Sequence, residues 1–221
     1  MAIRNILKSL RKRASQSLFL SSINGFYRYY FETRRKNFGY IAKDAYVRFP
    51  IRVKEPQNVF LYDHCHIMGG ALISAAKGKF IMKKYSGAAE NLVVITSTHP
   101  TYLGEWFMEK GNGNAFAEAK DIIVEEDVWI ATNVTLLIGA HIGRGAVIGA
   151  GSVVRGKVPP YAVVAGNPAK IVGFKFTPEE IVAHETNLYP ESDRLPLSLL
   201  EKNYDKYYIQ RMSEIRNYLR L

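Results

Sequence analysis

The sequence predicts an all-β fold in which short strands stack into a regular coil. Six residues repeat without a break between Val124 and Pro159, as VEEDVW, IATNVT, LLIGAH, IGRGAV, IGAGSV and VRGKVP. An ordinary buried strand pair alternates with period two and has no reason to keep a six-residue period over 36 residues. Branched aliphatic residues fill the first position, at Val124, Ile130, Leu136, Ile142, Ile148 and Val154, and small residues or valine fill the fifth, at Val128, Val134, Ala140, Ala146, Ser152 and Val158.

Each repeat supplies one short flat strand and one turn, so that stacked turns bury a shared apolar interior. Each added turn of such a coil buries more apolar surface against its neighbour, and the two ends need caps that stop further stacking. The pattern is weaker over residues 41–98, where we expect irregular early coils. The strings LYDHCH and IMGGAL keep the period there, and the expected interior positions are Leu61, Cys65, Ile67, Ala71, Ile73, Ile81 and Tyr85.

Residues 99–120 interrupt the repeat with the glycine-rich, asparagine-rich segment HPTYLGEWFMEKGNGNAFAEAK. A long insertion in a regular stack is a place where function concentrates, because the rigid coil positions it. After the last repeat, Pro159 and Pro160 end the strand pattern. Thr177, Pro178 and two acidic residues then have the order of a helix start, and residues 198–220 predict a second helical segment.

The chain carries a net charge of +10, most of it near the N-terminus. Residues 1–40 contain nine lysines and arginines and one acid, Glu32. Apolar residues at helical spacing in the first stretch predict a basic amphipathic helix that lies on an anionic membrane, with packing on the body or on a sister subunit as the alternative. The apolar positions are Ile3, Ile6, Leu7, Leu10 and Ala14. No nucleic-acid-binding motif accompanies these charges.

The single cysteine, Cys65, excludes an internal disulfide and suits a reducing compartment. The sequence contains no run of 18 apolar residues, so it does not predict a membrane span. A secretory signal would need an uninterrupted apolar segment, but serines interrupt the one apolar patch near the N-terminus. We therefore expect a cytoplasmic protein, with peripheral contact at the inner face of the membrane through residues 1–20.

Two strings carry a resemblance to a known family: DVWIATNVTLLIGAHIGRGAVIGAGSVVRGKVPPYAVVAGNPAKIV, from Asp127 to Val172, and VVITSTHPTY, from Val93 to Tyr102. Over roughly residues 92–172 the chain resembles the hexapeptide-repeat acyltransferases, in the branch of maltose, galactoside and polysaccharide O-acetyltransferases. The resemblance implies a left-handed parallel β-helix and acetyl-CoA as an acyl donor that runs along the coil edge. It also implies a homotrimer with three sites in clefts between adjacent coils, in which the insertion reaches towards a neighbour. The sequence itself divides into a basic helical arm (1–38), a β-helix domain (39–173) that includes the 99–120 insertion, and a C-terminal helical extension (174–221). The two helical arms lie outside the family's common core.

Acetyl transfer to an alcohol needs a group that removes the hydroxyl proton during attack, and histidine suits this role near neutral pH. His99 resembles the family's base in the same His-Pro context. The resemblance also places Trp129 beside the acetyl end of the cofactor, with Thr132 and Ala150 near the pantetheine.

The phosphates of CoA require cations. Arg155 falls where the family has threonine followed by lysine. Here Gly156 occupies the lysine position and Lys157 comes one residue later, so the assignment stays open between Arg155 and Lys157. Lys170, in GNPAK, matches a basic residue that contacts CoA in the family.

The acceptor site departs from the sugar-acetylating relatives. Their asparagine and aspartate in the early coils are replaced here by Met68, Ala75 and Ala76. Candidate replacements in the insertion are Tyr102, Glu105 and Trp106, the tryptophan because aromatic faces stack on sugar rings, although loop packing explains these residues equally well.

The remaining histidines have simpler interpretations. His141 and His184 are expected to lie at the surface. The string Asp63-His64-Cys65-His66 suggests a metal site, but Cys65 occupies a small-residue position and fits coil packing better.

The leading functional hypothesis is an acetyl-CoA-dependent O-acetyltransferase acting on a saccharide or lipid-linked saccharide of the cell envelope. The alternatives are an N-acetyltransferase of an amino sugar and a non-catalytic trimeric scaffold. A trimeric zinc carbonic anhydrase on the same coil would need three converging histidines, which the spacing does not offer.

Overall fold

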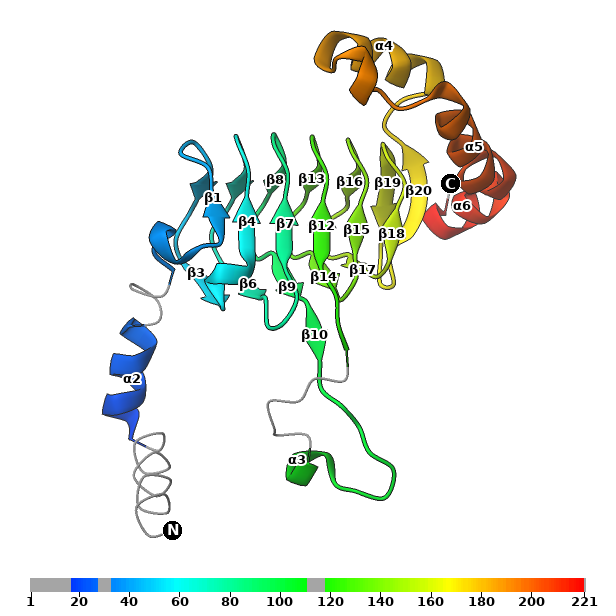
Figure 1. Cartoon of the computed structure of the whole chain (residues 1–221). Helices are drawn as coiled ribbons and strands as arrows, with labels where there is room; N and C mark the ends of the chain where they lie inside the picture. The colour runs from blue at the N-terminus through cyan, green and yellow to red at the C-terminus, as the bar shows by residue number, and fades with distance from the viewer. Residues whose placement is uncertain (1–16, 28–32, 111–117, 221) are drawn as a thin grey trace.

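The computed structural model describes residues 17–27, 33–110 and 118–220, and it shows a left-handed parallel β-helix of about six turns with helices near both ends (Figure 1). Three parallel sheets form the faces of a triangular prism. Sheet A contains β1 (Tyr40–Ile41), β4 (Val59–Leu61), β7 (Phe80–Met82), β12 (Ile122–Val124), β15 (His141–Ile142) and β18 (Lys157–Val158).

The other two faces have the same construction. Sheet B contains β2 (Tyr46–Val47), β5 (His66–Ile67), β8 (Gly87–Ala88), β13 (Trp129–Ile130), β16 (Val147–Ile148), β19 (Ala162–Ala165) and β20 (Lys170–Phe174). Sheet C contains β3 (Ile51–Lys54), β6 (Ala71–Ser74), β9 (Val93–Ile95), β14 (Thr135–Leu137) and β17 (Val153–Val154). The chain runs from sheet A to B to C in each turn, which gives three corners, here called A–B, B–C and C–A.

The six-residue pattern fills the interior as predicted, since every first-position and fifth-position residue from Val124 to Val158 is buried. Val124 pairs with Ile142, three repeats later. The last turn differs, because Ile142 pairs with Val158 and not with residue 160. The C–A corner at Arg155 and Gly156 is two residues shorter than the period requires. Val158 therefore takes a first-position place in sheet A, and Lys157 beside it faces outward.

The early coils correct one expectation. Leu61, Cys65, Ile67, Ala71 and Ile73 are buried as predicted. Ile81 and Tyr85 are not interior residues, since Ile81 is half-buried and Tyr85 is 61% exposed. Extra residues at the corner between β6 and β7 shift the phase, so that the interior is filled instead by Phe80, Met82, Ser86 and Ala88.

Residues with positive φ recur at the corners and let the chain turn within a few residues. At the B–C corner these include Asn91 (φ 64°) and Asn133 (φ 59°) on successive coils. Asparagine tolerates this left-handed conformation better than most residues. The Asn91 amide donates to Oδ1 of Asn133 at 3.0 Å, so that the side chains also tie neighbouring coils together.

The insertion leaves the prism at the C–A corner. Its base is a short antiparallel pair formed by β10 (Ser97–Thr98) and β11 (Glu118–Ala119). The pair carries the segment with α3 (Phe107–Lys110) away from the body, at the edge opposite the A–B corner (Figure 1). Residues 111–117 of the insertion lie outside the described residues.

The N-terminal arm is described only in part. Helix α2 (Leu18–Tyr27) stands apart from the first coil in Figure 1. The amphipathic helix predicted over residues 3–14 lies outside the described residues. No helix in the described part of the chain is long and apolar enough to cross a membrane.

The C-terminal end caps the prism. Strand β20 pairs antiparallel with β19 and so ends the parallel ladder. Helix α4 (Pro178–Leu188) begins at Thr177, whose side chain forms a capping box with Glu180, as the sequence predicted. Helices α5 (Leu197–Tyr207) and α6 (Met212–Leu219) complete the cap, together with the short 3₁₀ helices η4 (Glu191–Asp193) and η5 (Ile209–Arg211). Two further 3₁₀ helices, η2 (Arg35–Asn37) and η3 (Pro56–Asn58), lie near the first coils.

A buried carboxylate fastens this helical cap to the prism. Glu185 of α4 is 1% exposed and accepts hydrogen bonds from the Tyr161 hydroxyl (3.0 Å), the Leu195 amide (2.6 Å) and the Arg144 guanidinium (3.2 Å). The guanidinium also lies 4.0 Å from the centre of the Tyr189 ring. Burial raises the pKa of Tyr189 to about 12 despite this cation. The phenol therefore stays neutral at physiological pH.

Replacing Glu185 by alanine is expected to destabilise the cap by about 2–4 kcal/mol, because Tyr161 and Arg144 lose a buried partner. Thermal unfolding at fixed protein concentration measures the loss, which corresponds to a Tm lower by roughly 5–10 °C. The exposed Glu191, replaced in the same way, is the control and should leave Tm within about 2 °C. Equal Tm values for the two variants would contradict the assigned role of Glu185.

Candidate active site

Trp129 lies on the outer face of sheet B and is 51% exposed. Its neighbour in the ladder is Gly87, and a Cβ atom there would come within 3.3 Å of the indole. Glycine therefore leaves room for the ring to lie against the sheet. The indole borders a cavity of about 440 Å³ whose other lining residues are His64, His66, Tyr85, Ser86, Gly87, Asp127, Val128 and Lys175.

Thr132 and Ala150 lie on successive coils at the B–C corner, next to Trp129. The amide of Gly151 donates to the carbonyl of Thr132 at 3.0 Å, which places Ala150 one coil beyond Thr132. The Thr132 hydroxyl donates to the Glu90 carbonyl, so this side chain also stabilises the corner. Ala150 is exposed in its turn. The structure thus brings together three residues that the resemblance assigns to the acetyl and pantetheine end of the cofactor.

The three predicted cations meet at the end of the prism. Arg155, Lys157 and Lys170 line one cavity of about 250 Å³. Two residues of the C-terminal cap, Tyr207 and Arg211, complete its wall. Sequence analysis missed both, because they lie outside the repeat and no motif marks them. Arg155 and Lys157 both line this cavity, so the choice between them stays open.

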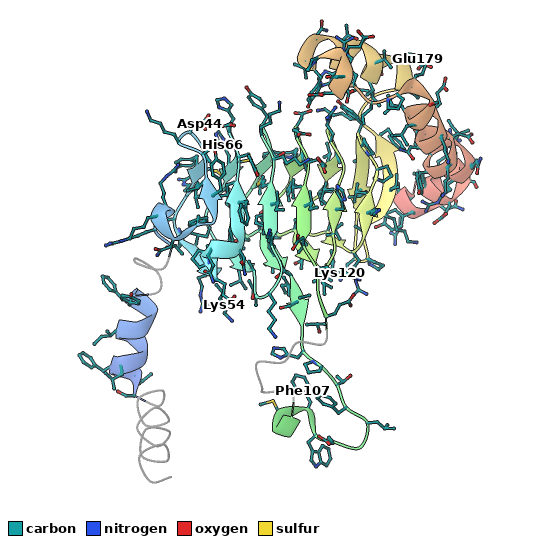
Figure 2. The ribbon with its side chains drawn as sticks, viewed as in Figure 1. Asp44, Lys54, His66, Phe107, Lys120 and Glu179 are labelled. Atoms are coloured by element: carbon teal, nitrogen blue, oxygen red, sulfur yellow. The ribbon has the colours of Figure 1, made fainter. Side chains whose placement is uncertain are left out.

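His99 lies elsewhere. It is exposed at the start of the insertion, where its ring meets Phe107 edge-on with 6.0 Å between centroids. Tyr102, Glu105 and Trp106 are exposed on the same insertion. A triangular prism places the C–A corner opposite sheet B, so the interior separates His99 from Trp129 within one chain. Figure 2 shows Phe107 and His66 at opposite edges of the molecule.

The predicted acceptor residues therefore form two groups. Met68 lies at the B–C corner and its amide donates to the Ala88 carbonyl, so it belongs with Trp129 and not with the insertion. Ala75 and Ala76 are buried and line no surface. Tyr102, Glu105 and Trp106 belong with His99. No single chain gathers all the predicted site residues.

The sequence around Cys65 has a structural explanation. The thiol is buried, lies 3.0 Å from the Lys83 carbonyl, and has its pKa raised to about 11 by burial. Such a thiol is a poor nucleophile. His64 is exposed on the other side, 2.7 Å from Asp44 and stacked on Tyr85. Among the described residues, no group of three histidine, cysteine or acidic side chains is placed to hold a metal ion.

Two histidines are less exposed than the sequence suggested. His141 is half-buried and lies 2.8 Å from Glu125, which also pairs with Lys83 at 2.6 Å. Burial alone would raise the pKa of Glu125, but hydrogen bonds from Lys83 and His141 lower it below its ordinary value. His184 packs edge-on against Tyr161 and beside Phe176, and its Nε2 atom is buried. His184 is therefore only partly exposed, because α4 folds back onto the last coil.

The chain is similar in sequence to curated proteins over part of its length. A chloramphenicol acetyltransferase of Klebsiella aerogenes is 47% identical over 68 residues, which are 31% of this chain and 32% of the relative. The putative lipopolysaccharide biosynthesis O-acetyl transferase WbbJ of Escherichia coli (strain K12) is 43% identical over 75 residues, or 34% of this chain and 35% of the relative. The chain thus spans about a third of the length of these curated relatives. No family model matches it.

The fold is also that of solved structures. The hexapeptide-repeat acetyltransferase VCA0836 from Vibrio cholerae O1 biovar eltor, complexed with acetyl-CoA, superimposes with a TM-score of 0.56 at 23% identity, over 79% of this chain and 88% of that one. The chain has the fold of the hexapeptide-repeat acetyltransferases. Within this fold, Trp129 lies on the outer face of sheet B, Thr132 and Ala150 lie at the adjoining B–C corner, and the basic cavity lies at the last coil.

Proposed function

We propose that the chain is an acetyl-CoA-dependent O-acetyltransferase that acts on a hydroxyl of a saccharide. One observation carries the proposal: Trp129 lies on the outer face of sheet B, Thr132 and Ala150 follow at the adjoining B–C corner, and a cavity lined by three cations of the β-helix lies at the last coil. Pantetheine is narrow and uncharged, whereas the other half of CoA carries phosphates, so these three residues and the cavity match the two ends of the donor. The names of the similar proteins support acetyl transfer.

His99 is the proposed general base. A neutral hydroxyl is a poor nucleophile, so a base that takes its proton as the carbon–oxygen bond forms lowers the barrier. The same imidazolium can then return the proton to the departing thiolate of CoA. The carbonyl oxygen gains negative charge during attack and requires fixed hydrogen-bond donors.

The site is proposed to lie between two copies of the chain. The segment from Leu92 at the B–C corner to His99 runs along sheet C and past the C–A corner, a distance on the order of 20 Å for extended chain. His99 is therefore too far from Trp129 and Thr132 of its own copy to act on a thioester held there. Exposed apolar side chains on the insertion, including Leu103, Trp106 and Met108, would be covered by the neighbouring copy. A homotrimer with three such sites satisfies both requirements.

The acceptor is proposed to be a saccharide or lipid-linked saccharide. Trp106 and Trp129, one from each side of the shared site, offer aromatic faces to a sugar ring. The similar WbbJ protein is named for lipopolysaccharide biosynthesis. N-acetylation of an amino sugar is the second candidate, since the same base would serve an amine.

Two measurements test the proposed function. Calorimetry with acetyl-CoA should show binding, and an assay of CoA release should respond to a hydroxyl acceptor from a panel of saccharides. Mass spectrometry of the product distinguishes an ester from an amide. Absence of acetyl-CoA binding would overturn the proposal in favour of a non-catalytic scaffold.

The N-terminal arm is proposed to hold the protein at the inner face of an anionic membrane. Helix α2 contains no charged residue and exposes Phe19, Leu20 and Ile23, while basic runs precede and follow it in the sequence. Apolar side chains that enter the interface and lysines or arginines that face anionic lipid act together in such anchors. A cytoplasmic, membrane-associated enzyme would meet lipid-linked acceptors there.

Replacing both Phe19 and Ile23 by serine is expected to reduce binding to vesicles of mixed anionic and zwitterionic lipid by roughly tenfold or more, because two apolar side chains are lost from the interface. Vesicle co-sedimentation measures the change. The protein should bind purely zwitterionic vesicles weakly and should detach as salt is raised. Unchanged vesicle binding, with a change of oligomeric state instead, would assign α2 to a contact between copies.

A further inference from the structure

The C-terminal cap places two side chains against the last coil of the prism. Phe174 of β20 packs against Tyr204 and Tyr208, with ring centroids 5.3 and 6.4 Å apart. Leu200 of α5 and Ile215 of α6 are buried. These contacts fix the segment between the two helices. Tyr207 and Arg211 are thereby held over the basic cavity at the end of the coil.

The cavity has an unbalanced charge. Four cations line it, Arg155, Lys157 and Lys170 from the β-helix and Arg211 from the cap, and no acidic side chain is among its lining residues. Within the described part of the chain, Arg155 and Lys157 form no ion pair. Cations held close together repel one another, and a bound anion compensates this repulsion. The arrangement therefore favours a ligand with phosphate groups.

One carboxylate competes for this place. Glu214 of α6 accepts two hydrogen bonds from Arg211, at 3.0 and 2.9 Å, and lies 3.8 Å from Lys170. It is exposed, does not line the cavity itself, and lies between the two cations. A phosphate that binds Arg211 must share the guanidinium with Glu214 or displace it.

A second cavity continues the first. It has a volume of about 390 Å³ and shares Lys157, Val158 and Tyr207 with the basic cavity. The apolar part of its lining includes Pro159, Pro160 and Leu195. Its polar and charged part is formed by Glu125, His141, Arg144 and Asn203. A partly apolar space beside a cavity lined by cations suits a purine base. Tyr207 forms the wall between the two spaces.

We propose that the C-terminal helices complete the donor site by holding the adenosine 3′-phosphate half of acetyl-CoA. Arg211 binds a phosphate together with Lys170 and Arg155, and Tyr207 lies beside the adenine. The inference rests on the proposed function. It adds that the cap, which lies outside the repeat, takes part in binding and does not only close the end of the coil.

The test compares CoA with 3′-dephospho-CoA by calorimetry on the full chain. Replacing Arg211 by alanine is expected to weaken CoA binding by about 10- to 100-fold and to leave dephospho-CoA binding nearly unchanged. Arg216→Ala, an exposed cation on α6 that lines neither cavity, is the matched control. Glu214→Gln should strengthen CoA binding, since the competing charge is gone. Circular dichroism and Tm confirm that each variant is folded.

Tyr207 has its own comparison, with phosphopantetheine as the probe that lacks the adenosine half. Tyr207→Ala should weaken CoA binding several-fold and leave phosphopantetheine binding unchanged, whereas Tyr207→Phe should retain most of the affinity for CoA. If the wild-type chain binds CoA but Arg211→Ala keeps the same preference for CoA over dephospho-CoA, this inference is wrong and the proposed function stands. If the wild-type chain binds no CoA, the proposed function itself fails.

Discussion

Replacing His99 by alanine is expected to lower the rate of acetyl transfer by about 10²- to 10⁴-fold, the usual contribution of a positioned general base. His99 lies on the insertion and touches none of the corner residues assigned to acetyl-CoA. The variant should therefore bind acetyl-CoA as well as the wild type does. Steady-state kinetics with saturating acceptor, together with calorimetry, measure the two quantities separately.

The packing of His99 against Phe107 needs its own control. His99→Gln preserves much of the side-chain volume and one hydrogen-bonding group but cannot accept the proton as imidazole does. It should be nearly as inactive as His99→Ala while keeping the oligomeric state of the wild type. A variant at this position that transfers acetyl groups at the wild-type rate would remove His99 from the mechanism.

The repeat explains which parts of the fold could be predicted from sequence. A six-residue period fixes both the interior residues and the stacking, and therefore Ile130, Leu136 and Ile148 are buried where the pattern places them. The prediction was wrong for Ile81 and Tyr85, where residues added at a corner change the phase. It was also wrong for the register of Val158, where a corner is shortened. The number of residues at a corner is set by local turn geometry, and it cannot be predicted from the repeat of buried residues.

The candidate site likewise contains residues whose proximity the repeat predicts and residues whose proximity it does not predict. Thr132 and Ala150 lie on adjacent coils because eighteen residues make one turn, so sequence spacing already implied their proximity. Arg211 and Tyr207 come from helices that fold back over the last coil, and no period relates them to Arg155. The separation of His99 from Trp129 follows from the order of sheets around the prism, which motifs alone do not give.

A mixture of two inactive chains is expected to regain activity if the site is shared between copies. The first chain carries His99→Ala. The second carries Ala150→Trp, whose large side chain in an exposed turn at the B–C corner would block the path proposed for pantetheine. In trimers assembled at random from equal amounts, roughly a quarter of the sites pair an intact His99 with an intact corner. Each pure variant should have almost no activity.

Co-expression with two different affinity tags isolates the mixed trimers, and CoA release measures their activity. Recovery to a substantial fraction of the wild-type rate requires that the base and the thioester come from different copies. If each site were complete within one chain, every chain in the mixture would carry a defect, and the mixed trimers would stay as inactive as their parents. The distance imposed by sheet C between the B–C corner and the insertion makes recovery the expected result.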